Sequence, residues 1–246
     1  MNDKLATIIL AGGKGTRMKS DLPKVLHRVL GETMVSRVVA QAKSIGAKKI
    51  VVVVGYKKEL VQDELKNKSV EFAIQEEQLG TGHAIQMAEG NFTNWDGDIL
   101  ILSGDVPLLT TETIEKLIQK HKDEDADGTV LSAIFENPAG YGRIIRKEDG
   151  TYSHSVEEKD ASNEEKKIKE INSGIYIFKS KHLFNYLSNI GNDNAQGEYY
   201  LTDIVPMMVK DNKKVVLTVA NDPNEIEGVN TIEHLQNAEN KLRRIK

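Results

Sequence analysis

One short segment near the start of the chain combines glycines with basic side chains in a pattern suited to phosphate. A β-branched run ends in Gly12-Gly13-Lys14-Gly15-Thr16-Arg17, and Lys24 follows at a short distance. Successive backbone N–H groups of such a loop can surround an anion, while Arg17 and Lys24 supply full positive charges. The segment therefore predicts a nucleotide-binding loop.

Two better-known glycine signatures do not fit this loop. The P-loop requires Gly-Lys-Ser/Thr four residues after its first glycine, and the dinucleotide fingerprint requires a third glycine where Met18 stands. An ordinary glycine-rich turn after a first strand is an equally good explanation of Gly12 and Gly13 alone. The two basic side chains favour the functional explanation.

A carboxylate and an amide are candidates for holding a metal ion. Asp105 follows an apolar run and Ser103-Gly104, whereas Asn230 precedes the last predicted helix. Magnesium takes few protein ligands and completes its shell with water and phosphate oxygens, so one Asp and one neutral oxygen donor can suffice. Local turn and helix-cap chemistry would also explain both residues. The same alternative applies to Gly142, Glu157 and Asn172.

Strands and helices alternate in the first half of the chain, which predicts an α/β fold with a doubly wound sheet that is parallel in this half. Its polar loops, after Leu10, at 75–83 and at 103–105, should meet at the carboxyl ends of the strands. From 129 onward the pattern resembles a smaller, mixed-sheet β lobe, with a charged, solvated segment at 159–169. The expected helices are 34–45, 57–66, 81–91, 110–123, 181–187, 201–210 and 231–244; the expected strands are 49–54, 70–75, 98–102, 129–135, 142–145, 151–156, 168–178 and 215–219.

Composition excludes several classes of function. The 246 residues carry a net charge of -4 and no cysteine, which disfavours nucleic-acid binding and excludes disulfides, thiolate metal sites and cysteine nucleophiles. The six histidines have no metal-ligand spacing, and no Gly-x-Ser-x-Gly elbow is present. We find neither a signal peptide nor a membrane-spanning run, so we expect a soluble, cytoplasmic protein without membrane partners.

At this point the chain resembles one family along nearly its whole length. It is similar to the sugar nucleotidyltransferases, and within them to the N-acetylglucosamine-1-phosphate uridyltransferase domains of bifunctional uridyltransferase/acetyltransferases. The first motif marks the superfamily and the later ones are more specific. The motifs are Leu10–Met18, Leu22–His27, Gln78–Ala84, Gly104–Leu108, Gly140–Ile144, Glu170–Gly174, Asn194–Asp203 and Glu227–Asn230.

The resemblance implies a reaction and a set of roles. UTP and N-acetylglucosamine 1-phosphate would give UDP-N-acetylglucosamine and pyrophosphate by Mg²⁺-assisted in-line attack on the α-phosphate, supplying cell-wall precursors. Arg17 and Lys24 would be catalytic, and Asp105 and Asn230 would hold Mg²⁺. The implied substrate-binding residues are Leu10, Ala11, Gly12, Gly13, Lys24, Gln75, Gly80, Thr81, Ser103, Gly104, Asp105, Gly142, Glu157, Asn172, Tyr200 and Asn230; of these, Gln75, Gly80 and Thr81 would read uracil, while Gly142, Glu157, Asn172 and Tyr200 would contact the sugar.

The resemblance also divides the chain. Residues 1–230 would form the nucleotidyltransferase domain, with a nucleotide-binding half at 1–128 and a sugar-binding half at 129–230, and 231–246 would be a terminal helix or linker. The family's left-handed β-helix acetyltransferase domain is absent from this sequence, so we expect a monomer or a weak oligomer. Ser103, where tyrosine is frequent, and Arg28, where proline is usual, depart from the pattern.

Two alternatives stay open at this stage. One is a nucleotidyltransferase for another sugar 1-phosphate, such as glucose 1-phosphate. The other is a catalytically silent module that binds a nucleotide sugar and regulates a partner. The presence together of Arg17, Lys24, Asp105 and Asn230 speaks against the silent module.

Overall fold

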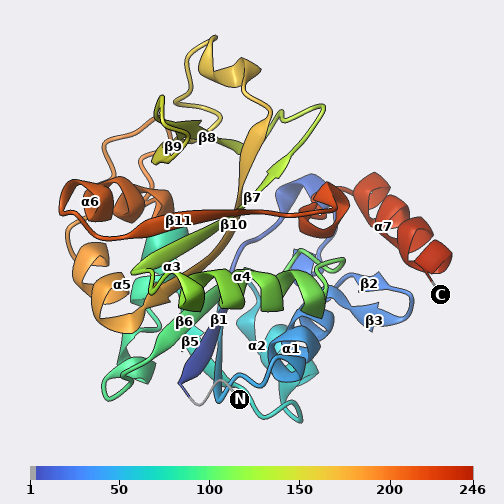
Figure 1. Cartoon of the computed structure of the whole chain (residues 1–246). Helices are drawn as coiled ribbons and strands as arrows, with labels where there is room; N and C mark the ends of the chain where they lie inside the picture. Colours follow the sequence, from blue (N-terminus) through green and yellow to red (C-terminus); the bar gives the residue numbers. More distant parts are fainter. Residues whose placement is uncertain (1–3, 246) are drawn as a thin grey trace.

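A nine-stranded mixed sheet, covered by helices on both faces, organises the computed structural model, which describes residues 4–245 (Figure 1). The strand order is β11-β7-β10-β6-β1-β4-β5, and the β8–β9 hairpin extends from β10. A separate two-stranded hairpin joins β2 to β3. The strands are β1 (Leu5–Ala11), β2 (Arg28–Val29), β3 (Glu32–Thr33), β4 (Lys49–Val54), β5 (Glu71–Ile74), β6 (Asp98–Ser103), β7 (Gly128–Ile134), β8 (Gly142–Arg146), β9 (Tyr152–Val156), β10 (Glu170–Lys179) and β11 (Val215–Val219).

The predicted α/β fold with a mixed sheet is confirmed. Strands β4, β1 and β6 lie side by side and parallel, and β5 is parallel to β4. Strand β10 enters antiparallel between β6 and β7, so one sheet runs through both halves of the chain. The chain passes from β1 through β4 to β5 and then returns to the other side of β1 with β6. A ligand crevice is expected beyond the carboxyl end of β1, where the strand order reverses.

Alternating side chains of the buried strands feed two hydrophobic cores, one on each face of the sheet. In β4, for example, Val52 and Val54 pack on one face, and Val51 and Val53 on the other. The first core lies under α1, α2 and α4, and the second under α3, α5 and α6. The helices are α1 (Met34–Ser44), α2 (Lys58–Leu65), α3 (Thr81–Gln86), α4 (Thr111–Asp123), α5 (Ser180–Leu187), α6 (Ile204–Lys210) and α7 (Ile232–Ile245).

Two predicted helices are shorter than expected by three residues or more. Helix α3 ends at Gln86 and is followed by a 3₁₀ turn at Glu89–Phe92, where the N–H of Asn91 bonds three residues back to Ala88. Helix α6 begins at Ile204 rather than at 201, after a 3₁₀ turn at Leu201–Asp203. This start places Pro206 in the first turn of α6, where the absence of an N–H costs no helical hydrogen bond.

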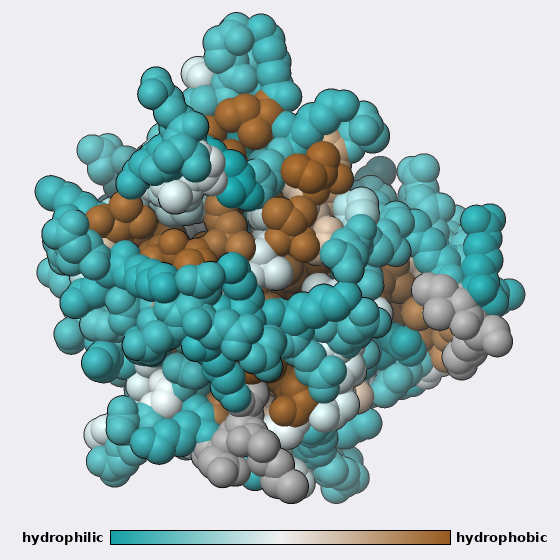
Figure 2. All heavy atoms as spheres, viewed as in Figure 1, coloured by the Kyte–Doolittle hydropathy of each residue, from teal (hydrophilic) through white to brown (hydrophobic). Residues whose placement is uncertain are grey.

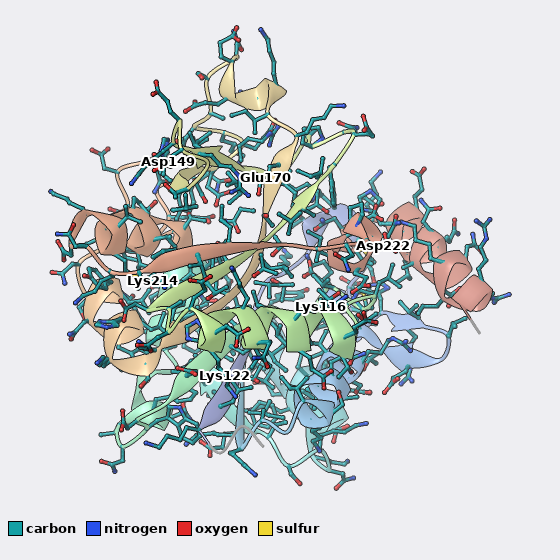
Figure 3. All side chains as sticks on the ribbon, viewed as in Figure 1. Lys116, Lys122, Asp149, Glu170, Lys214 and Asp222 are labelled. Atoms are coloured by element: carbon teal, nitrogen blue, oxygen red, sulfur yellow. The ribbon has the colours of Figure 1, made fainter. Side chains whose placement is uncertain are left out.

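The β8–β9 hairpin and the charged segment after it project from the sheet (Figure 1). Figure 3 places Asp149 toward the tip of the hairpin and Glu170 at its base, on β10. Arg146 clamps the Glu170 carboxylate with Nε and Nη2, at 2.7 and 2.6 Å, and Ser132 Oγ donates to the same carboxylate at 2.7 Å. These charge-assisted bonds anchor the hairpin to the central strands.

The face drawn in Figure 2 is mostly hydrophilic, with hydrophobic residues gathered between the projecting hairpin and β11. Ile134 at the end of β7 and Val219 at the end of β11 are among the exposed large hydrophobic residues. Neither residue lines the cavity described next.

Candidate active site at the carboxyl ends of the strands

A cavity of about 280 Å³ opens where β1, β5 and β6 end. The three polar segments that the sequence placed at this edge all contribute to its wall, so their predicted convergence agrees with the geometry. The lining residues are Leu10, Ala11, Gly12, Gly13, Lys24, Val25, Gln75, Gln78, Gly80, Thr81, Ala84, Ser103, Asp105 and Glu198.

The glycine-rich loop reaches this cavity because its residues permit close approach of the backbone. Gly15 has φ +66°, and a Cβ there would collide with the Lys24 side chain. A Cβ on Gly12 would lie 2.9 Å from Gln75 Oε1. The Gly12 carbonyl also accepts a 3.0 Å hydrogen bond from the N–H of Tyr56. The glycine-rich loop is therefore packed between Lys24 and Gln75, which also line the cavity.

The predicted catalytic and metal-binding side chains form one charged cluster. Lys24 Nζ contacts Asp105 Oδ2 in an ion pair and donates to Asn230 Oδ1 at 3.0 Å. Arg17 Nη2 donates to the same Asn230 oxygen at 2.8 Å. The side chains of Lys24 and Asp105 are each 18% exposed, which limits the screening of their attraction by water. The structure thus brings Asp105 and Asn230, from distant parts of the sequence, to Arg17 and Lys24.

Asp105 and Asn230 fit a hard divalent cation. Their two oxygens already converge on one positive charge, the Lys24 ammonium, and carboxylate and amide oxygens are the donors that Mg²⁺ prefers. The N–H of Val229 donates to the Asp105 carbonyl at 2.9 Å, which holds the two segments together. Among residues 4–245 there is no group of three or more His, Cys, Asp or Glu that could hold a metal ion without such a neutral donor.

Gln75 forms the buried wall of the cavity near Gly80 and Thr81. Its side chain is held by Nε2, which lies 3.1 Å from the Gly80 carbonyl and 3.2 Å from His83 Nδ1. Only 4% of Gln75 is exposed. The Thr81 hydroxyl accepts a 3.1 Å bond from the N–H of Leu201, so this hydroxyl supports the local fold.

The loop that carries Glu198 and Tyr199, from the second half of the chain, closes the cavity near Gly80 and Thr81. The N–H of Tyr199 donates to the Leu79 carbonyl, and the Tyr199 carbonyl accepts from the N–H of Gly82, both at 2.8 Å. Gly80 has φ +109°, and a Cβ there would lie 2.5 Å from the Tyr199 oxygen. Glu198 is brought to the cavity by this pairing.

The four residues predicted for the sugar side do not line this cavity but gather beside it. Gly142 of β8 pairs with Asn172 of β10, and a Cβ on Gly142 would lie 3.4 Å from Glu157 Oε2. Glu157 Oε1 accepts from the Thr202 hydroxyl at 3.3 Å. The hydroxyl of Tyr200 accepts from Gln196 Nε2 at 2.9 Å.

Burial and neighbouring acids set the electrostatics of this second cluster. Burial raises the pKa of Glu157, with further contributions from the charges of Asp203, Asp160 and Glu198, against a lowering by the Thr202 hydrogen bond. Burial also raises the pKa of Tyr200 to about 12. Both shifts favour the neutral forms, which suits contacts to uncharged hydroxyl and amide groups.

Asn172 is locked by its own surroundings. Its Nδ2 donates to the Tyr176 hydroxyl at 2.6 Å, and its Oδ1 accepts from the N–H of Gly174 at 3.1 Å. The register of β10 against β7 shifts between Asn172 and Tyr176, and Gly174 has φ +75°. A Cβ at Gly174 would lie 3.8 Å from Ser103 Oγ, so this irregularity joins the two clusters.

Some site residues were not predicted from the sequence. Gln78 and Glu198 belong to quoted motifs, yet nothing in the sequence singled them out as lining the cavity. Arg28, by contrast, lies in the β2–β3 hairpin, donates to the Gly31 carbonyl at 2.7 Å and is absent from the lining. Its departure from the family pattern therefore does not alter the cavity wall.

Comparison with known proteins identifies the family. A model of the nucleotidyl transferase family, described as "Nucleotidyl transferase", matches residues 6–224. The chain belongs to this family. It is 50% identical over 237 residues to "Bifunctional protein GlmU" of Streptococcus uberis, covering 96% of this chain and 52% of that protein. It is also 50% identical over 242 residues to the protein of the same name from Caldanaerobacter subterraneus subsp. tengcongensis, covering 98% and 52%.

The chain thus spans about half the length of these curated relatives. Among solved structures, a UDP-glucose pyrophosphorylase complexed with UDP-glucose matches with a TM-score of 0.75 at 19% identity, covering 99% of each chain. At this identity the match establishes the fold. None of the helices within residues 4–245 is long and apolar enough to cross a membrane.

Proposed function

We propose that this nucleotidyltransferase joins UTP to N-acetylglucosamine 1-phosphate, giving UDP-N-acetylglucosamine and pyrophosphate for cell-wall precursor synthesis. The observation that carries the proposal is the convergence of Lys24, Asp105 and Asn230 beside the glycine-rich loop. The identity of about 50% to proteins named bifunctional GlmU supports the choice of sugar and base.

The reaction needs positioning and charge rather than a covalent enzyme intermediate. An oxygen of the sugar phosphate attacks the α-phosphorus of UTP in line, the new P–O bond forms, and the bond to the β-phosphate oxygen breaks to release pyrophosphate. Arg17 and the N–H groups near Gly13 hold the triphosphate. Lys24, which pairs with Asp105 beside this loop, would lie between both anions and offset the charge that develops there.

Asp105 and Asn230 would hold the magnesium ion, which supplies charge stabilisation for the phosphates when bound. Lys24 already contacts both oxygens, so a bound cation requires the ammonium to give up at least one of them.

The two remaining clusters bind the parts of the substrates that do not react. In this proposal Gln75, Gly80 and Thr81, which line the cavity, would flank the base, and Ser103, which lines the cavity near Gly174, would lie between base and sugar together with Gly104. Gly142, Glu157, Asn172 and Tyr200 receive the sugar, where Glu157 accepts hydroxyl hydrogen bonds when ionised and Asn172 contacts the N-acetyl group. Binding energy from these remote groups orients the two phosphates.

The decisive experiment is pyrophosphate release with UTP, Mg²⁺ and N-acetylglucosamine 1-phosphate, run beside glucose 1-phosphate and glucosamine 1-phosphate. The proposal expects the highest kcat/KM with the N-acetylated sugar and loss of the signal after chelation of the metal. Preference for another sugar would contradict the proposed sugar substrate but support the proposed nucleotidyl-transfer reaction. Absence of release with every pair would favour a regulatory module that binds nucleotide sugars.

Two further expectations belong to the same proposal. Light scattering should find a monomer or a weak oligomer, and fractionation of the source cells should place the protein in the cytoplasm. The division into a nucleotide-binding half at 1–128 and a sugar-binding half at 129–230 is tested by substitutions in each half that raise the KM of one substrate alone.

A further inference from the structure

His83 is a conspicuous side chain that the proposed reaction does not use. It lies on α3, partly buried, with its Nδ1 3.2 Å from Gln75 Nε2 and its ring centroid 6.5 Å from that of Tyr199. Gln75 itself is one of the most buried polar residues of the chain. The contact therefore fixes a group that faces the cavity.

The direction of the Gln75 amide follows from its neighbours. The Gly80 carbonyl lies 3.1 Å from one end of the amide, and a carbonyl oxygen can only accept. That end must be Nε2, which donates. His83 Nδ1 meets the same nitrogen, so it must be the unprotonated ring nitrogen that accepts the second hydrogen.

The rest of Gln75 is held as firmly. Its N–H donates to the Val54 carbonyl at 2.8 Å, and its carbonyl accepts from Gln78 Nε2 at 3.1 Å. With both Nε2 hydrogens engaged, the amide offers only Oε1, which lies against Gly12. No hydrogen bond to this oxygen is formed within residues 4–245.

We propose that His83 is a positioning residue for nucleotide selection, which fixes the Gln75 amide so that it presents an acceptor to the base. This inference rests on the proposed function, in which Gln75 flanks the base. An acceptor matches the N3–H of uracil and opposes the N3 lone pair of cytosine. A Gln75 amide free to turn over could bond to either base, so His83 sets the discrimination between UTP and CTP.

The test compares His83→Leu, which has no acceptor, with His83→Asn, whose Oδ1 can stand where Nδ1 stands. Equilibrium binding of UTP and CTP with Mg²⁺ is measured by calorimetry for the wild type and both variants. The wild type should prefer UTP, His83→Leu should lower the UTP-to-CTP affinity ratio roughly tenfold, and His83→Asn should restore most of it. A purely structural role would weaken both nucleotides equally.

Three results would overturn the inference: a wild type that binds UTP and CTP alike, an unchanged ratio in His83→Leu, or an Asn variant that behaves as the Leu variant does. Because binding is measured without turnover, a protein that selects UTP but releases no pyrophosphate contradicts the proposed function alone. If His83→Leu does not fold, the test is the rate of hydrogen exchange at Gln75 Nε2 in the wild type, measured by NMR. Slow exchange of both Nε2 hydrogens supports the inference, and exchange as fast as in an exposed glutamine contradicts it.

Discussion

The Tyr141 hydroxyl accepts a 3.2 Å hydrogen bond from the backbone N–H of Gly228, 87 residues away in the sequence. Tyr141 immediately precedes β8 on the sugar side, while a Cβ at Gly228 would lie 3.6 Å from Asp105 Oδ2. The bond thus connects the proposed sugar side to the segment that carries the proposed metal ligands. Burial of this hydroxyl raises its pKa, so it stays protonated at neutral pH.

Tyr141→Phe should therefore disturb the metal site more than the fold. Loss of one such hydrogen bond is worth about 1 kcal/mol, and we expect kcat/KM to fall roughly fivefold with a higher Mg²⁺ concentration for half-maximal activity. Tyr186→Phe is the matched control, since its hydroxyl bonds to Asp211 at 2.9 Å, outside the site. Equal Mg²⁺ requirements in both variants would refute the connection.

Lys24→Met keeps the length of the side chain and removes its charge. We expect kcat/KM for pyrophosphate release to fall by about 10²–10³, because the group that offsets charge at both phosphates is lost. The control is Lys58→Met. Lys58 Nζ pairs with Glu76 Oε1 at 2.5 Å, neither residue lines the cavity, and this variant should retain full activity. Retention of activity by Lys24→Met would exclude the assigned role.

Gly80→Ala tests the closure of the base side. The new Cβ would lie 2.5 and 2.9 Å from the Tyr199 oxygen and nitrogen, at a φ of +109° that L residues rarely adopt. We expect a loss of roughly 2 kcal/mol in the free energy of unfolding by urea denaturation. Gly191→Ala has open space around its Cβ and should change stability by less than about 0.5 kcal/mol. Similar values for the two variants would contradict the packing argument.

Glu157→Gln tests the raised pKa of the partly buried Glu157 carboxyl. The folded protein holds this proton more tightly than the unfolded chain does. Stability is therefore lost as pH rises from the unfolded pKa through the raised folded pKa. The Tm of the Gln variant should exceed that of the wild type at pH 8 and equal it near pH 4. The KM of the variant for the sugar phosphate should rise. A difference in Tm that does not depend on pH would contradict a raised pKa of Glu157 in the folded protein.

Much of the fold was accessible from the sequence because buried strands and amphipathic helices leave clear periodic signals. The apolar run before Asp105 predicted a strand, and β6 ends at Ser103 as its pairing with β1 requires. Placing parallel strands in one sheet then sufficed to bring Asp105 to the glycine-rich loop. The two-residue strands β2 and β3 were not predicted, since so short a hairpin carries no pattern.

The remaining parts of the site depend on contacts that no local pattern encodes. Glu198 reaches the cavity only because the backbone of Tyr199 pairs with Leu79 and Gly82. Similarly, Gln75 Nε2 meets His83 Nδ1 at 3.2 Å, and no feature of the sequence distinguishes His83 from the other histidines. Both contacts are decided by how a polar loop packs, so they became visible only in three dimensions.

The attachment of the β8–β9 hairpin bears on how such an enzyme could diversify. The hairpin pairs with β10 through Gly142 and Arg143, whereas the groups that we propose to bind the phosphates follow the ends of β1 and β6 at the centre of the sheet. Evolution can therefore change the length and residues of the β8–β9 hairpin without changing the central strands. We expect proteins of this fold to gain new sugar-phosphate substrates chiefly through changes in this hairpin, while the nucleotidyl-transfer reaction stays the same.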